Sequence, residues 1–156
     1  MDKKKLLKYA IDYLSKYDSS KKNLEDILKR KIFRSKISGL DKNKCLDYLK
    51  EIINQLEKNN LVNDKRYSST KISSLSRAGR SKNYIHNYLL KKGIEKSLIQ
   101  YNLEKFQEDN SNWELNSAKK FAQKKKLLTS DDTYEKKLAK MARAGFSYEI
   151  CKKILS

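Results

Sequence analysis

The stretch SRAGRSKNYI, residues 76–85, has a close counterpart in ARAGFSYEIC, residues 142–151. Both contain Arg-Ala-Gly-x-Ser, although the whole chain has only four glycines. In each stretch the glycine follows the last residue of an apolar helical pattern, and the serine precedes the first residue of the next pattern. Glycine readily adopts the left-handed conformation that ends a helix, and a serine hydroxyl accepts a hydrogen bond from a free amide at the start of one. Each pentapeptide therefore predicts the turn of a helical hairpin.

The hairpin pattern occurs a third time near the N-terminus. Aligning Ser20 with Ser81 and Ser147 brings three apolar pairs into register, namely Leu24/Leu28, Ile85/Leu89 and Cys151/Leu155. Asp18 stands in the first hairpin where the other two have glycine, and Asp visits the left-handed region more readily than most residues. The alignment predicts an internal repeat.

Apolar residues at helical spacing recur along the whole chain and predict an all-α protein. The chain has no proline to interrupt its helices. We expect a polar connection over residues 35–43 and a helix end at Asn59 and Asn60. Asn63 or Asp64 is expected to cap one helix, and Ser130 or Asp131 another.

Three successive helical repeats account for this organisation, at residues 1–62, 63–110 and 111–156. Small helical repeats bury their apolar faces against themselves and against their neighbours, and such stacking produces elongated, curved modules. We therefore expect a fold of that kind.

The net charge is strongly positive, at +18, from 37 Lys and Arg against 19 Asp and Glu. The excess is spread evenly: residues 1–62 have 16 basic and 9 acidic side chains, residues 63–110 have 10 and 5, and residues 111–156 have 11 and 5. A basic tail would concentrate the excess at one end. The even distribution indicates an elongated protein that lies on a polyanion such as nucleic acid.

The residue types needed for catalysis or metal binding are scarce. The chain has a single histidine, His86, and two distant cysteines, Cys45 and Cys151, without the spacing of a zinc site. There is no glycine-rich phosphate loop and no nucleophile elbow. We expect a protein that is not an enzyme and needs no cofactor. The reduced cysteines, and the lack of a signal peptide or a membrane-spanning apolar run, suggest the cytoplasm.

Residues 65–94 contain no acidic side chain. Phosphates, or a carboxylate-rich groove in a protein, would relieve the repulsion among the cations of this segment. The candidate contacts within it are Arg66, Arg77, Arg80, Lys82, Lys91 and Lys92. A second strip lies on a helix that the apolar residues Trp113, Ala118, Phe121 and Ala122 predict, and it contains Lys119, Lys120, Lys124, Lys125 and Lys126. Lysines of this kind bind phosphates without reading base sequence. Tyr84 and Tyr88 fall on an apolar stripe and are expected in the core.

Residues 60–99 resemble the central repeat of the RecX family of regulatory proteins, which modulate the RecA recombinase. The matching features are an apolar residue and an acidic pair before an Arg and an aromatic, a basic-x-Gly turn, an amphipathic helix, and a Lys-Gly-Ile: here Val62, Asn63, Asp64, Arg66, Tyr67, Arg77, Gly79, Lys92, Gly93 and Ile94. Asn63 departs from the family's usual acidic residue. The flanking segments resemble the family's outer repeats.

The resemblance implies three tandem three-helix repeats that lie along a RecA filament on DNA and inhibit or tune recombination and ATP turnover. The partners it implies are the recombinase filament and DNA, with no membrane. In this family Arg66 and Arg77 recur in the motif, and both are also candidates for bracing helix ends.

A different class of function is also open, a sequence-specific helix-turn-helix transcription regulator. Such a module consists of a helix, a tight turn and a second helix that reads bases, which Lys82, Asn83 and Asn87 could do here. Regulators of this class bind symmetric half-sites as dimers, but the chain has no heptad seam for dimerisation. We therefore favour the recombinase modulator and expect a monomer.

Overall fold

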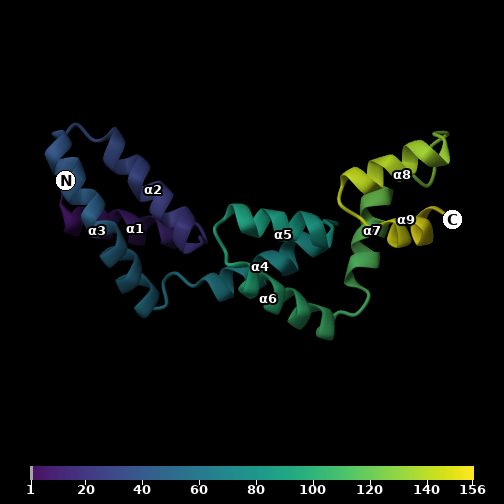
Figure 1. Ribbon diagram of the computed structural model, residues 1–156, viewed down its shortest axis with the longest axis horizontal. Coiled ribbons are helices and arrows are strands. Elements are labelled where there is room, and N and C mark those ends of the chain that lie inside the picture. The colour runs from purple at the N-terminus through teal and green to yellow at the C-terminus, as the bar shows by residue number, and fades with distance from the viewer. Residues whose placement is uncertain (1) are drawn as a thin grey trace. The chain divides into compact units, whose positions relative to one another are not determined.

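The computed structural model describes residues 2–156. The chain is all-α, as predicted, and these residues contain no strand. The helices are α1 (Lys3–Lys16), α2 (Lys21–Arg34), α3 (Gly39–Lys58), α4 (Asp64–Arg77), α5 (Lys82–Lys91), α6 (Lys96–Asp109), α7 (Trp113–Lys124), α8 (Tyr134–Arg143) and α9 (Tyr148–Leu155). Figure 1 shows their order along the chain.

The chain divides into two compact units. The first consists of the chain up to Tyr67 together with Lys92–Ile94, and the second of Ser68–Lys91 together with Glu95–Ser156. Helix α4 therefore begins in the first unit and ends in the second. The predicted division into repeats at 1–62, 63–110 and 111–156 stays a prediction.

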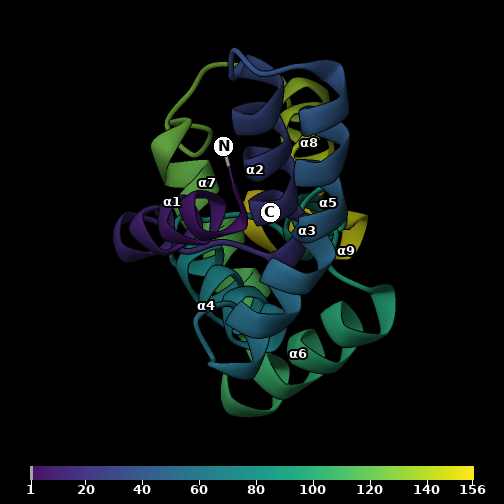
Figure 2. The same ribbon diagram turned by 90° about the vertical axis from the view of Figure 1, so that its left-hand side faces the viewer.

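In the first unit, α1, α2 and α3 enclose one apolar core. Helices α2 and α3 pack as a pair, and both views show them side by side (Figure 1, Figure 2). Their apolar stripes turn inward, so that Leu24, Leu28, Ile52 and Leu56 are at most 1% exposed. Each fully buried side chain of this size contributes about 1.5–3 kcal/mol, which holds the three helices together.

In the second unit, α7, α8 and α9 pack around another core. It contains Met141, Cys151 and Leu127, none of them exposed to solvent. Phe146 belongs to the same core, and its ring centroid lies 5.6 Å from that of Phe121. Phe146 lies in the pentapeptide at 143–147, so this turn contributes an aromatic side chain to the core.

The predicted turn chemistry is present in both pentapeptides. Gly79 and Gly145 have φ of +83° and +96°, so each supplies the left-handed residue after a helix. The hydroxyls of Ser81 and Ser147 accept hydrogen bonds from the amides of Tyr84 and Ile150, at 3.1 and 3.3 Å. Both serines therefore cap helices.

Two predicted boundaries are wrong, although two others are confirmed. Asn60 has a φ of +58°, and Asn63 accepts the amide of Arg66 at 2.9 Å, both as predicted. The expected connection over residues 35–43 is shorter, because Ser38 caps α3 by accepting the amide of Asp41. Thr133, rather than Ser130 or Asp131, caps α8.

Ser20 and Ser81, which cap α2 and α5, each also donate a hydrogen bond to a turn that is distant in the sequence. We call this bond, together with the bond from the next backbone amide to a carboxylate, the joint. The Ser20 hydroxyl donates to the Lys92 carbonyl at 2.6 Å, immediately before Gly93. The backbone amide of Lys21, next in sequence, donates to the Asp64 carboxylate at 2.9 Å. All of these residues belong to the first unit.

The second unit contains the same joint. The Ser81 hydroxyl donates to the Ala144 carbonyl at 2.7 Å, before Gly145, and the Lys82 amide donates to the Glu114 carboxylate at 2.9 Å. Gly145 therefore corresponds to Gly93 rather than to Gly79. The two similar pentapeptides occupy different places, since one joins α4 to α5 and the other joins α8 to α9.

Candidate functional site

The candidate site is the set of basic residues around the turn from α4 to α5 and along α7, all in the second unit. Helix α4 ends at Arg77, where backbone carbonyls lack partners within the helix. The ammonium groups of Lys120 and Lys124 donate to the carbonyls of Arg77 and Ala78, at 3.0 and 3.1 Å. These two lysines therefore hold α7 against the end of α4.

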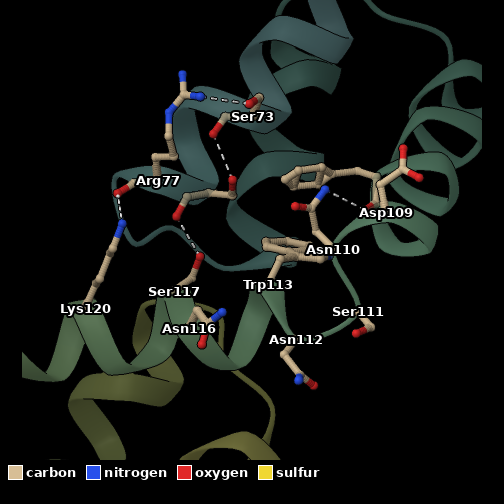
Figure 3. A pocket seen from close by; sticks show the side chains of 12 residues that line it. Ser73, Arg77, Asp109, Asn110, Ser111, Asn112, Trp113, Asn116, Ser117 and Lys120 are labelled. Atoms are coloured by element: carbon tan, nitrogen blue, oxygen red, sulfur yellow. Dashed lines mark hydrogen bonds between the residues drawn. The ribbon is translucent and has the colours of Figure 1, made fainter.

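The approach of α7 to this turn depends on the glycine at its centre. A Cβ added to Gly79 would lie 3.2 Å from the Lys120 Cβ and 3.3 Å from the Ser117 carbonyl oxygen. The buried Ser117 hydroxyl donates to the Ser76 carbonyl at 2.8 Å. Figure 3 shows Arg77, Ser117 and Lys120 around the junction.

Arg80 is exposed beside this turn, and its guanidinium lies 4.4 Å from the ring centroid of Tyr84. Tyr84 is 37% exposed, so the prediction that it lies in the core is wrong. The buried stripe of α5 is narrow: Ile85 and Leu89 fill it, and Tyr84 lies beside it. The attraction between the guanidinium and the face of the ring favours this position of the Arg80 side chain.

Lys82 and Lys91 lie at opposite ends of α5, and both side chains are exposed. Lys91 contributes to a hollow of about 340 Å³ whose other members include Tyr84, Tyr88, Arg143 and Gly145. Tyr88 is half-buried, and its ring centroid lies 6.5 Å from that of Tyr84. Among the described residues that line this hollow, none is acidic.

The lysine strip is shorter than predicted. Helix α7 ends at Lys124, so Lys125 and Lys126 do not continue the helical face. Lys126 has a φ of +55°, and the Leu127 amide returns to the Ala122 carbonyl at 2.9 Å. Lys126 thus takes the left-handed position after the helix that a glycine usually occupies. All five lysines from Lys119 to Lys126 are nevertheless exposed.

Two candidates, Arg66 and Lys92, belong to the first unit. The Arg66 guanidinium donates to the Asn60 carbonyl at 3.0 Å, so it braces the end of α3. Lys92 is half-buried, and its carbonyl receives the Ser20 hydroxyl. The bracing role considered for Arg66 is thus present. Arg77 donates to Ser73, one turn earlier in its own helix, at 3.2 Å.

A hollow of about 510 Å³ lies beside Arg77 and Lys120 (Figure 3). The half-buried Phe106 and the buried Trp113 contribute to its lining, with ring centroids 5.5 Å apart. This hollow is not among the sites predicted from the sequence. In the sequence, Phe106 and Trp113 flank a polar segment at residues 108–112. This spacing alone does not predict that the two rings contact each other.

Residues 2–156 contain no group of three or more His, Cys, Asp or Glu side chains that could hold a metal ion. His86 is half-buried on α5, and both cysteines are buried and outside any disulfide. Across the same residues, every helix is too short or too polar to cross a membrane.

No protein-family model matches the chain. The regulatory protein RecX of Myxococcus xanthus is 31% identical over 154 residues, covering 94% of this chain and 81% of the relative. The regulatory protein RecX of Bacillus licheniformis is 28% identical over 96% of this chain, which spans about half, 53%, of that relative.

Solved structures agree with these relatives. The crystal structure of RecX from Lactobacillus salivarius matches with a TM-score of 0.71 and 26% identity, covering 98% of this chain and 94% of the other. A second crystal structure, of a regulatory protein RecX, has a TM-score of 0.73 over 97% of this chain and 70% of the other. Its identity is 19%, so it supports the fold alone.

Proposed function

The chain belongs to the RecX family of regulatory proteins, and from this membership we propose that it binds the filament of a RecA-type recombinase on DNA. In this proposal the bound protein inhibits or tunes recombination and ATP turnover, and thereby regulates DNA repair. It acts as a monomer in the cytoplasm.

The observation that carries the proposal is the acid-free segment at residues 65–94. Its Arg80, Lys82 and Lys91 side chains are exposed on α5 and the turn before it. None of the three side chains forms an ion pair within residues 2–156, although Arg80 is oriented by Tyr84. Cations without carboxylate partners gain most from an external anion, because a phosphate or carboxylate relieves their mutual repulsion.

The geometry separates the candidates into two groups. Arg66, Lys120 and Lys124 donate to carbonyls at helix ends, and Arg77 donates to Ser73 within its own helix. All of these side chains are exposed, but those of Arg80, Lys82, Lys91, Lys119, Lys125 and Lys126 make no such bond within residues 2–156. We assign the contacts with filament and DNA to this second group, with Lys92 as a half-buried neighbour of Lys91.

The DNA contacts in this proposal are made to phosphates and do not depend on base sequence. Lysine binds phosphate as a point charge, and each phosphate contact adds to the salt dependence of binding. Affinity for a random duplex should therefore match affinity for any selected sequence and fall steeply with salt. Strong preference for one selected sequence would instead favour a helix-turn-helix regulator.

A pull-down with purified RecA-type recombinase, with and without single-stranded DNA, tests the proposal. Wild-type protein should retain the recombinase, and the variant R80Q/K82Q/K91Q should retain much less. The control K96Q/K136Q/K153Q removes the same charge from exposed positions elsewhere in the second unit. Absence of the recombinase from the wild-type fraction under both conditions, or equal loss in both variants, would contradict the proposal.

A further inference from the structure

The first unit has a hollow of about 350 Å³ between α1 and α2 that the proposed function does not use. It is lined by Tyr9, Ile27, Arg30, Lys31, Arg34 and Ser35. Three of the six residues are cations, and none is acidic. The sequence gives little sign of this, because α2 has Glu25 and Asp26 close to its basic residues.

Helical spacing explains why the charges separate. Ile27, Arg30, Lys31 and Arg34 stand at i, i+3, i+4 and i+7, so they share one face of α2. Glu25 pairs instead with Lys29, at 3.1 Å between carboxylate oxygen and ammonium nitrogen. The Lys31 ammonium lies 4.9 Å from the Tyr9 ring centroid, which fixes it at the edge of the hollow.

The arginines of this hollow are not needed to close α2. At its end the Ser35 hydroxyl donates to the Ile32 carbonyl, and the Lys42 ammonium donates to the Phe33 carbonyl at 3.2 Å. Arg30 and Arg34 are exposed and form no ion pair within residues 2–156. Their donors therefore remain available to a ligand.

We propose that this hollow is a docking site for a carboxylate-rich segment of a partner protein. The planar guanidinium groups of Arg30 and Arg34 suit bidentate contact with carboxylates, and Lys31 adds a third positive charge. Ile27 and Tyr9 supply carbon surface for the methylene groups and apolar neighbours of the acidic side chains. Phosphates need no such apolar surface, so an acidic peptide fits the lining better than a nucleic-acid backbone.

Fluorescence anisotropy with a labelled peptide of alternating Asp and Leu tests the proposal directly on the full chain. We expect R30Q/R34Q to weaken binding of this peptide by about tenfold or more. The matched control K50Q/K58Q removes two exposed cations from α3 of the same unit, outside the hollow, and should change binding by less than about twofold.

Charge reversal distinguishes a local site from general attraction to a basic protein. R30E/R34E should lose the Asp-Leu peptide and gain binding of a Lys-Leu peptide of the same length. Equal losses in R30Q/R34Q and K50Q/K58Q would overturn the proposal. It would also be overturned if a thymidine oligonucleotide bound wild type more tightly than the peptide and lost that affinity in R30Q/R34Q. Neither outcome depends on whether this protein binds the recombinase, so the two proposals can fail independently.

Discussion

Gly145 lies at a position where a side chain has no room. Its φ is +96°, and an added Cβ would lie 2.4 Å from the Ser81 Oγ and 3.2 Å from the Asn83 Cβ. We expect Gly145→Ala to lower the free energy of unfolding by about 1–3 kcal/mol, because the backbone becomes strained and the added methyl group displaces the Ser81 hydroxyl from the Ala144 carbonyl. Urea denaturation followed by circular dichroism measures this change.

Gly39 provides the control for that substitution. It opens α3, and no atom of another described residue lies within 4 Å of an added Cβ, so Gly39→Ala should leave stability unchanged or raise it by up to about 1 kcal/mol. Equal effects at the two glycines would show that the joint at Gly145 does not constrain the fold.

The Cys151 thiol gives a second test at the residue scale. Burial raises the pKa of this thiol above its usual value of 9.0. It therefore stays protonated where an exposed cysteine ionises, and its contribution to stability is full below pH 9.0 and is lost as the pH rises through the folded value.

In a Cys45→Ala background, Cys151 should react with a disulfide reagent at pH 9 at least about a hundredfold more slowly in the folded protein than in urea. The rate of thiolate release on mixing measures this. Similar rates in the folded protein and in urea would mean that the core formed by α7, α8 and α9 opens freely.

Residue-scale predictions succeed where the chemistry is local. Gly79 and Ser81 could be assigned as a helix stop and a helix cap because their dihedral and hydrogen-bonding preferences act over a few residues. The second bond of Ser81, to the Ala144 carbonyl 63 residues away, has no local signal. Tyr84 was misplaced for a similar reason, since only packing shows that Ile85 and Leu89 already fill the buried stripe.

At the scale of helices, the lysines of α7 have two different roles. Lys120 and Lys124 donate to carbonyls at the end of α4, and Lys119 makes no such bond within residues 2–156. The variant K120M/K124M keeps the aliphatic stems and loses these bonds, so we expect stability to fall by about 0.5–1.5 kcal/mol per lysine. Thermal denaturation of each variant gives the value.

K119M removes a comparable exposed charge without touching α4, so its melting temperature should stay close to that of wild type while its affinity for DNA falls. A stability loss in K119M as large as in K120M/K124M would contradict the inference that Lys120 and Lys124 hold α7 against the end of α4.

The end of α7 shows why helix boundaries escape prediction. No glycine follows Lys124, and the sequence KKKLL reads as continuing helix. Burial of Leu127, which is 0% exposed, offsets the cost of a left-handed Lys126. That gain comes from α8 and α9, which pack around the same core, and a reading confined to α7 could not anticipate it.

At the scale of the whole molecule, composition and periodicity predicted the all-α class, because it depends on sums along the chain. The net charge predicts a polyanionic partner in the same way, and that part stays a prediction. Composition could not show which cations hold helix ends and which remain available. Nor could it show that Arg30 and Arg34 turn away from Glu25, since charges that alternate in sequence separate onto different faces of a helix.

The central claim is that this family member acts on a recombinase filament through exposed cations of its second unit. The most direct measurement is the ATP turnover of a RecA-type recombinase on single-stranded DNA at increasing concentrations of the protein. We predict that turnover changes with wild type, and that R80Q/K82Q/K91Q needs about tenfold more protein for the same effect. Unchanged turnover at every ratio, with the filament intact, would contradict the account.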